Sequence, residues 1–267
     1  MENIYFGSET QQGLQRRSDL LWSLLKSNPA YACHGRSVAL ADGTPENLAE
    51  QIALARLLGA GAVEGVATGD VAARTAAINA AGLTTDQYTE WEGKAEVLDA
   101  ARAMIAARKL SNDLVVHATD AQTSAEDLRG LDALTQRCEV LLPMASFLRG
   151  QDQPTVCLFA KDRNGRIVGA SASVVQYHPD HPKGQNAWWG MLSTDPDRRG
   201  EGIALVMGAM CILAMHDRFG TAHFLTGIRQ GNAPSEALCS KLGLQPTART
   251  FLIAIDPTVF GAGRVTK

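Results

Sequence analysis

The chain has 267 residues, with 25 lysines and arginines against 28 aspartates and glutamates and a formal net charge of −3. This balance excludes a protein built around contacts with nucleic-acid phosphates. The longest uncharged apolar run, at residues 203–215, is shorter than the roughly 18 residues that a membrane span needs. With 45% hydrophobic residues, the chain can fill one large or two small domains. We therefore expect a globular protein with neither a nucleic-acid nor a membrane partner.

Five cysteines without CxxC spacing are typical of free thiols in a reducing compartment. The sequence does not start with a charged segment followed by an apolar one, so we expect a cytoplasmic protein. Side chains that ligate metals do not occur at a usable spacing, and we expect no metal. Residues 2–7 resemble a protease-cleavage tag, and we leave residues 1–8 out of the fold prediction.

Hydrophobic periodicity and helix-ending residues predict alternating helices and strands in the first half of the chain. The clearest helix start is Thr44-Pro45, a capping residue followed by a proline in the first turn. We predict helices at 14–26, 45–58, 69–81 and 93–109, and strands at 36–41, 62–67 and 85–91.

The second half begins after the polar residues 110–113, where we place a domain boundary. An Asn164-Gly165 pair predicts a hairpin turn between two of the strands, because such turns need positive φ angles. We predict strands at 114–118, 154–160, 166–177, 188–194, 222–228 and 249–255, and helices at 124–142, 203–220 and 234–242. The predicted domains are residues 1–110 and 111–267.

The order of elements at 36–83 repeats at 187–244, and each series ends in Gly-Leu. Two interpretations are open: a degenerate half-copy of the second domain, or an unrelated accessory domain. The acidic turn at 42–47 occupies the place of a glycine-rich turn in the second series. Since carboxylates repel a diphosphate, we expect no coenzyme at the first series.

A glycine-rich turn lies between the strand 188–194 and the long apolar helix that follows it. Arg199-Gly-Glu-Gly202-Ile-Ala204 opens this helix. Glycines let a ligand approach the backbone closely, and the free N–H groups at a helix N-terminus attract anions. The turn therefore predicts a phosphate-binding cradle.

This turn fits the Q/R-x-x-G-x-G/A motif of the GCN5-related N-acetyltransferases (GNAT superfamily). A later segment from Asn232 to Leu244 resembles that family's N-x-x-[AS]-x-x-L-Y-x-K-x-G-F motif. The resemblance covers residues 113 to about 256. It implies an α/β (α+β) class, with a mixed, mostly antiparallel sheet, helices on both faces and the acyl-CoA N-acyltransferase fold, next to an N-terminal α/β domain.

The resemblance also implies acetyl-CoA as co-substrate, bound in a gap where two strands diverge. Asn232 would bind the pantetheine arm, cap the following helix, or do both. The Arg199 guanidinium would add a charged contact. Main-chain groups of Leu192 and Thr194 would pair with the pantetheine, and the amides of Arg199, Gly200, Glu201, Gly202, Ile203 and Ala204 would hold the diphosphate.

Acyl transfer to an amine needs a base for the amine and an acid for the departing thiolate. The family often carries a glutamate near the strand before the cradle, but none lies between residues 183 and 196. His178, His181 and Asp195 are the alternatives for the base. For the acid, Cys239 stands where many members carry a tyrosine, and Tyr177 or water are the alternatives.

The resemblance predicts an N-acetyltransferase that moves an acetyl group from acetyl-CoA to a small-molecule amine by direct transfer in a ternary complex. A non-catalytic acyl-CoA-binding or sensing protein is the alternative, and a protein or peptide acetyltransferase is a third interpretation. Neither the acceptor nor the oligomeric state follows from the sequence, which leaves a homodimer open.

Overall fold

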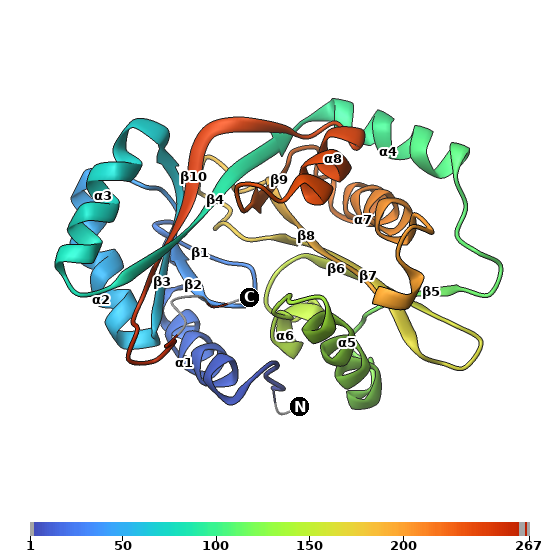
Figure 1. Cartoon of the computed structure of the whole chain (residues 1–267), viewed down its shortest axis with the longest axis horizontal. Helices are drawn as coiled ribbons and strands as arrows, with labels where there is room; N and C mark the ends of the chain where they lie inside the picture. Colours follow the sequence, from blue (N-terminus) through green and yellow to red (C-terminus); the bar gives the residue numbers. More distant parts are fainter. Residues whose placement is uncertain (1–2, 262–264, 266–267) are drawn as a thin grey trace.

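A computed structural model describes residues 3–261 and 265 as one ten-stranded, mostly antiparallel sheet with helices around it (Figure 1). The strand order is β1-β2-β3-β10-β4-β9-β8-β7-β6-β5. Among the described strands, only β2 with β3 and β8 with β9 pair in parallel. The predicted fold class, a mixed and mostly antiparallel sheet with helices, is confirmed.

The N-terminal elements follow the predicted alternation, with shifted ends. The segment predicted as one helix at 45–58 begins as a 3₁₀ turn. The three-residue strand at 31–33 was not predicted. The elements are α1 (Glu9–Leu25), β1 (Tyr31–Cys33), β2 (Val38–Leu40), η1 (Pro45–Asn47), α2 (Leu48–Leu58), β3 (Ala60–Ala67), α3 (Thr68–Ala80), β4 (Thr84–Gly93) and α4 (Ala95–Ala107).

The C-terminal elements also match the prediction, except that the helix predicted at 124–142 ends early. A loop replaces its last turn, and a short helix that was not predicted follows this loop. The elements are β5 (Val115–Ala118), α5 (Ala125–Arg137), α6 (Ala145–Leu148), β6 (Thr155–Lys161), β7 (Ile167–Val175), β8 (Ala187–Thr194), η2 (Pro196–Arg198), α7 (Ile203–Phe219), β9 (Phe224–Ile228), α8 (Ala233–Lys241) and β10 (Gln245–Ile255).

The two halves of the chain exchange a strand. The C-terminal strand β10 lies between β3 and β4, both from the N-terminal half, and β4 pairs with β9 of the C-terminal half. The N-terminal half has the parallel pair β2 with β3, which is extended by β10, the last strand of the C-terminal half. The C-terminal half has the parallel pair β8 with β9, which is extended by β4, the last strand of the N-terminal half. This arrangement supports the half-copy interpretation, because the two series occupy equivalent places on either side of the β4–β10 pair.

Two hydrophobic clusters form the core, one on each side of β8. Trp188 belongs to a cluster with α1, α5 and α6, whereas Trp189 packs with α4, α7 and α8. Figure 1 shows these two groups of helices on opposite sides of the C-terminal strands. Successive residues of a strand point to opposite faces, so adjacent tryptophans anchor both layers.

Leaving residues 1–8 out of the fold was wrong for its described part. Phe6 is buried in the first cluster, and the Ser8 hydroxyl caps α1 by accepting a hydrogen bond from the Gln11 amide. Met1 and Glu2 lie outside the described residues. Within residues 3–261 and 265, no helix has the length and apolar character to cross a bilayer, and no cluster of potential metal ligands occurs.

Candidate active site

The parallel strands β8 and β9 pair over only two rungs. Ala187 faces Phe224 and Trp188 faces Leu225. Beyond these rungs β8 stays paired with β7, and β9 stays paired with β4. The two strands therefore open a gap within the sheet, at the place where the resemblance predicted one.

A β-bulge in β8 lies beside this gap. Ala172 pairs with Gly190 and Ala170 with Ser193, so two residues of β8, Met191 and Leu192, face a single residue of β7. Met191 adopts a φ of 57°, which costs a non-glycine residue roughly 1–2 kcal/mol. A bulge interrupts the ladder and re-aims the backbone. Main-chain groups around Leu192 are thereby released from β7.

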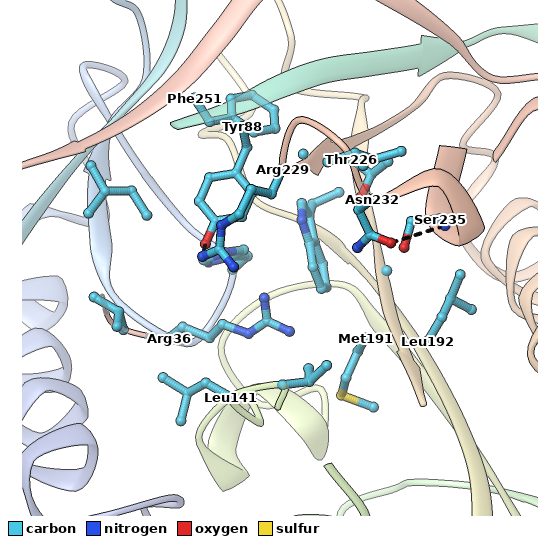
Figure 2. A pocket seen from close by; sticks show the side chains of 18 of the residues that line it. Arg36, Tyr88, Leu141, Met191, Leu192, Thr226, Arg229, Asn232, Ser235 and Phe251 are labelled. Atoms are coloured by element: carbon cyan, nitrogen blue, oxygen red, sulfur yellow. Dashed lines mark hydrogen bonds between the residues drawn. The ribbon is translucent and has the colours of Figure 1, made fainter. Parts of the chain in front are cut away.

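The gap adjoins a cavity of about 550 Å³ that residues from both halves of the chain line (Figure 2). Leu192, Asn232 and Cys239, to which the sequence analysis assigned coenzyme and catalytic roles, are among the residues that line it. Trp188 and Trp189 also line the cavity. The Trp189 indole nitrogen is already used, because it donates a hydrogen bond to the Gly208 carbonyl oxygen at 3.2 Å. The first half adds His34, Arg36, Ala60, Ala62, Glu64 and Tyr88.

Asn232 is both the cap of α8 and a cavity residue. Its side-chain oxygen accepts a hydrogen bond from the Ser235 amide at 3.3 Å, and Figure 2 shows the pair at the cavity wall. The capping interpretation is thus borne out by geometry. The amide nitrogen of the same side chain remains available as a donor for a ligand.

Of the predicted catalytic side chains, only Cys239 lines the cavity. Burial raises the pKa of its thiol to about 12. Tyr177 is buried against His181 in a stacked ring pair, and burial, reinforced by Glu64, raises the pKa of its phenol well above 10. His181 contacts Asp42 at 2.8 Å, and the His178 ring accepts from the Asp180 amide. The Tyr177–His181 segment therefore packs against β1 and Asp42 and is not part of the cavity lining.

Glu64 of β3 is a functional candidate that the sequence analysis missed. It lines the cavity, is only 7% exposed, and its Oε2 has no hydrogen-bond partner among the described residues. Burial, together with the nearby Glu90 carboxylate, raises the pKa of Glu64 to about 8, although Lys183 opposes this. The available signal was a single carboxylate in the apolar run Ala62-Val-Glu-Gly-Val66.

The cradle at the start of α7 has the backbone geometry that the glycine pattern predicts. Gly200 and Gly202 adopt φ angles of 88° and 80°, a left-handed conformation that side-chain-bearing residues rarely take. The first helical bond runs from the Val206 amide to the Gly202 carbonyl, which leaves the amides of residues 203–205 without a helical partner. The Arg199 amide is less available, because it points at the Pro196 carbonyl at 3.5 Å.

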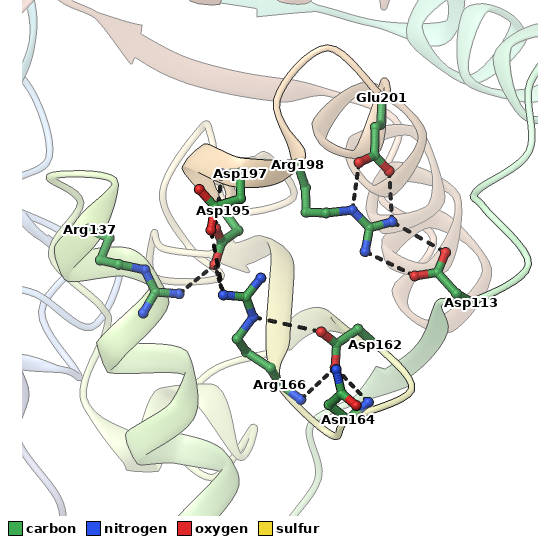
Figure 3. A network of polar contacts seen from close by, with 9 residues as sticks. All are labelled: Asp113, Arg137, Asp162, Asn164, Arg166, Asp195, Asp197, Arg198 and Glu201. Carbon is green, nitrogen blue, oxygen red and sulfur yellow. Dashed lines mark hydrogen bonds and ion pairs between the residues drawn. The ribbon is translucent and has the colours of Figure 1, made fainter.

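Arg198 links the cradle to the residues before β5 through two carboxylates (Figure 3). Its Nε donates to Glu201 at 2.5 Å, and its Nη1 donates to Asp113 at 3.0 Å. The Arg198–Glu201 ion pair compensates the charge of the Glu201 carboxylate, which would otherwise repel an anion bound next to it. Arg199 is exposed, so its guanidinium is free to reach a bound diphosphate.

Asp195, one predicted alternative for the base, is part of a second ion-pair network in Figure 3. Its carboxylate accepts from Arg137 at 2.7 Å and from the Asp197 amide. Burial raises its pKa, but the hydrogen bond from Asp197 and the charges of Arg166 and Arg137 outweigh this, so the pKa lies below its usual value. Asp195 therefore serves to fix η2 ahead of the cradle.

The residues present fit a coenzyme with an anionic diphosphate and an extended amide-containing arm. The cradle offers unpaired amides at a helix N-terminus, and the bulge releases main-chain groups beside the gap. A sheet that opens between two parallel strands next to such a cradle defines the acyl-CoA N-acyltransferase fold.

Residues 126–244 match the sequence profile of the acetyltransferase (GNAT) family. This segment is therefore similar to a GNAT acetyltransferase domain, and the match supports an acyltransferase enzyme. No curated protein sequence matches the chain significantly.

Similar solved structures extend over nearly the whole chain. A tandem GNAT protein from the clavulanic acid biosynthesis pathway is 14% identical, with a TM-score of 0.56, covering 95% of this chain and 97% of that one. A GCN5-related N-acetyltransferase from Kribbella flavida is 14% identical, with a TM-score of 0.53 and coverage of 91% and 95%. A Drosophila protein is 15% identical, with a TM-score of 0.54 and coverage of 93% and 89%. These likenesses show a shared fold and agree with a tandem arrangement.

Proposed function

We propose that this enzyme transfers the acetyl group of acetyl-CoA to the amine of a small molecule within a ternary complex. The observation that carries the proposal is that β8 contributes its bulge to a cavity lined by Glu64 and leads, through η2, into the cradle of α7. A binding or sensing protein would need the cradle alone, whereas a buried carboxylate with a raised pKa is typical of a catalytic group.

The C-terminal half supplies the coenzyme contacts in this proposal. The amides from Gly200 to Ala204 hold the diphosphate, assisted by the Arg199 guanidinium and, more weakly, by the Arg199 amide. The main chain at Leu192 and Thr194 pairs with the amides of the pantetheine arm. Asn232 contributes its free side-chain N–H group to the same arm.

Glu64 acts as the base in this proposal. The amine nitrogen forms a bond to the acyl carbon and the carbon–sulfur bond breaks, while Glu64 accepts one proton from the amine and the thiolate takes up a proton. A base whose pKa lies near the working pH is suited to this step. Cys239 remains the acid predicted from the sequence, but the high pKa of its thiol favours water in that role.

The cavity supports a small acceptor over a protein. A volume of about 550 Å³ lies within the range for small-molecule sites, and both halves of the chain enclose it. The second domain proposed at 111–267 thus acts together with residues of the domain proposed at 1–110. Five free cysteines support a reducing setting such as the cytoplasm. A homodimer is a further part of the proposal.

A screen of small primary amines with acetyl-CoA, read by release of the CoA thiol, tests the proposal. The wild-type protein should release CoA faster with one class of amine than without amine. The Glu64→Gln variant should retain coenzyme binding and lose that amine-dependent rate. Release that is independent of every amine would favour the binding or sensing function.

A further inference from the structure

The side chain of Arg36 is a half-buried cation that forms no ion pair with a carboxylate among residues 3–261 and 265. It lies in the loop between β1 and β2, and Figure 2 shows its guanidinium extending toward the middle of the cavity. Its Nε and Nη2 atoms are buried and lack hydrogen-bond partners among the described residues. Removing a charge from water without a partner is costly. The wall of the candidate acceptor site therefore contains an energetically unfavourable, unpaired positive charge.

The neighbours of Arg36 compensate its charge only in part. The guanidinium lies over the Trp188 ring at 4.7 Å, a cation–π contact. His34 packs edge-on against the same ring, and burial, together with Arg36, lowers its pKa to about 3, so that it is neutral. Burial lowers the pKa of Arg36 only to about 10, which leaves the guanidinium charged at neutral pH.

A second arginine at the cavity shows the contrast. Arg229 binds Asp86 through its Nη2 at 2.6 Å and its Nε at 3.2 Å. Its charge is therefore compensated within the protein. Among the described cavity residues, Arg36 is the arginine that no ion pair links to a carboxylate.

The two unpaired atoms also define the shape of the missing partner. Nε and Nη2 lie on one edge of the planar guanidinium, and the N–H groups on this edge are parallel. Such an edge matches the two oxygens of a carboxylate, which accept both hydrogen bonds at once. One unpaired cation balances one negative charge. A phosphate with a charge of about −1.5 to −2 would place excess negative charge in a cavity that already holds Glu64.

The position of Trp188 connects this edge to the reaction. Trp188 is the last residue of β8 that pairs with β9, so Arg36 lies beside the point where the gap begins. Resting on the proposed transferase function, we propose that the acceptor is an amine that also carries a carboxylate, and that Arg36 binds this carboxylate in a bidentate pair. Arg36 is then a specificity-determining residue contributed by the N-terminal half.

Matched pairs of acceptors test this inference with the full-length protein. β-Alanine, 4-aminobutyrate and phenylalanine are compared with their amides, and O-phosphoethanolamine is included as the phosphate-bearing amine. The kcat/KM of the wild type should be at least about tenfold higher for an acid than for its amide, because charged hydrogen bonds are lost in the amide. Equal values for acids and amides, or a preference for the phosphate, would overturn the inference.

Variants of Arg36 separate recognition from general damage. Arg36→Gln should lower kcat/KM for the acids to the level of the amides and leave the amides within about threefold. Arg36→Lys should fall between the two, since it keeps the charge but loses the planar edge. Arg163→Gln, at an exposed hairpin turn, is the control and should change neither. An equal loss for acids and amides in Arg36→Gln would contradict the assignment.

Binding measurements distinguish a failure of this inference from a failure of the proposed function. Isothermal titration with CoA present compares each acid with its amide on the wild type and on Arg36→Gln. If no amine is acetylated but an acid binds only to the wild type, the transfer proposal fails and the carboxylate site stands. If neither protein distinguishes the acid from the amide, the carboxylate site is wrong. A melting temperature of Arg36→Gln no lower than that of the wild type shows that the variant folds.

Discussion

Trp188 of β8 and Leu225 of β9 form the last pair before these two parallel strands diverge. This last pair lies one residue before Trp189 and four before the bulged Leu192, so the gap, the bulge and the cavity share one stretch of β8. The cradle of α7 follows the end of the same strand. A single segment of chain therefore orients both the proposed coenzyme path and the entrance to the acceptor cavity.

Binding of acetyl-CoA at the cradle should stabilise the folded protein by roughly 2.7 kcal/mol at a hundredfold excess over Kd. In Gly202→Glu, this thermal shift should disappear, because the variant places a strained, negatively charged residue at the N-terminus of α7. Gly150→Glu is a matched control, since Gly150 also has a positive φ and open space around its Cβ position. A shift that persists in Gly202→Glu would place the coenzyme elsewhere.

Replacing the proposed base should slow the chemical step. Glu64→Gln should lower kcat by about 10²-fold or more while leaving the acetyl-CoA thermal shift intact. The wild-type rate should rise with pH through about 8, where the Glu64 carboxyl loses its proton, and Glu64→Gln should lose that titration. Glu90→Gln is the comparison: it removes a charge that raises the Glu64 pKa and lies outside the cavity lining, so the titration should persist but move to lower pH. A Glu64→Gln variant with wild-type kcat would exclude this base.

The same carboxyl should make stability depend on pH. Burial and the Glu90 charge raise the pKa of Glu64 from 4.5 to about 8 in the folded protein. Between these two values the folded state retains a proton that the unfolded state releases, so the free energy of unfolding falls as pH rises. Glu64→Gln should therefore melt higher than the wild type at a pH above about 8, with the difference shrinking toward pH 4.5. Thermal melts across this range measure it, and a constant difference would contradict the assignment.

Cys239 should not be essential for turnover. The residue is 3% exposed, and burial raises the pKa of its thiol to about 12, which makes the thiol a poor proton donor and leaves little thiolate at neutral pH. Cys239→Ala should keep kcat and coenzyme affinity within about threefold, far less than the loss expected for a general acid. Steady-state kinetics measure both, and a loss of about a hundredfold in kcat would restore the cysteine as the acid.

Strand exchange should make the halves dependent on each other. A fragment of residues 111–267 lacks β3 and β4, the two strands that flank β10, and β4 is also the partner of β9. Exposed edges and apolar faces of this kind aggregate. The fragment should be insoluble alone, whereas co-expression with residues 1–110 should recover soluble protein that binds acetyl-CoA. Solubility and the thermal shift measure this outcome, and a soluble, fully active fragment alone would contradict it.

The local features of the fold could be predicted from the sequence. Glycine positions and apolar periodicity place α7 and its cradle within a few residues, because backbone φ angles and helix caps depend on neighbouring residues. The place of β10 between β3 and β4 could not be predicted, since pairing between segments so distant in sequence leaves no trace in local patterns. The short elements β1 and α6 were missed for a similar reason, as tertiary contacts and not periodicity define them.

The candidate site was predictable only where it carries a motif. Leu192 and Asn232, which line the cavity, could be named in advance because each has a set place relative to a sequence motif. The glycines of the first motif likewise indicate which amides form the cradle. Glu64 and Arg36 come from the half without a motif, and only the strand exchange brings that half to the cavity. The histidines of the Tyr177–His181 segment were suggested by their usual pKa, but ring stacking and the contact with Asp42 hold them elsewhere.

The central claim is that this protein moves an acetyl group to a small amine. Full-length protein incubated with isotopically labelled acetyl-CoA and a mixture of small amines, followed by mass spectrometry, tests it most directly. We predict label on the nitrogen of an amine, one free CoA for each acetylated amine, and no labelled protein as an intermediate. A protein that binds acetyl-CoA but passes no label to any amine beyond spontaneous reaction would contradict the claim.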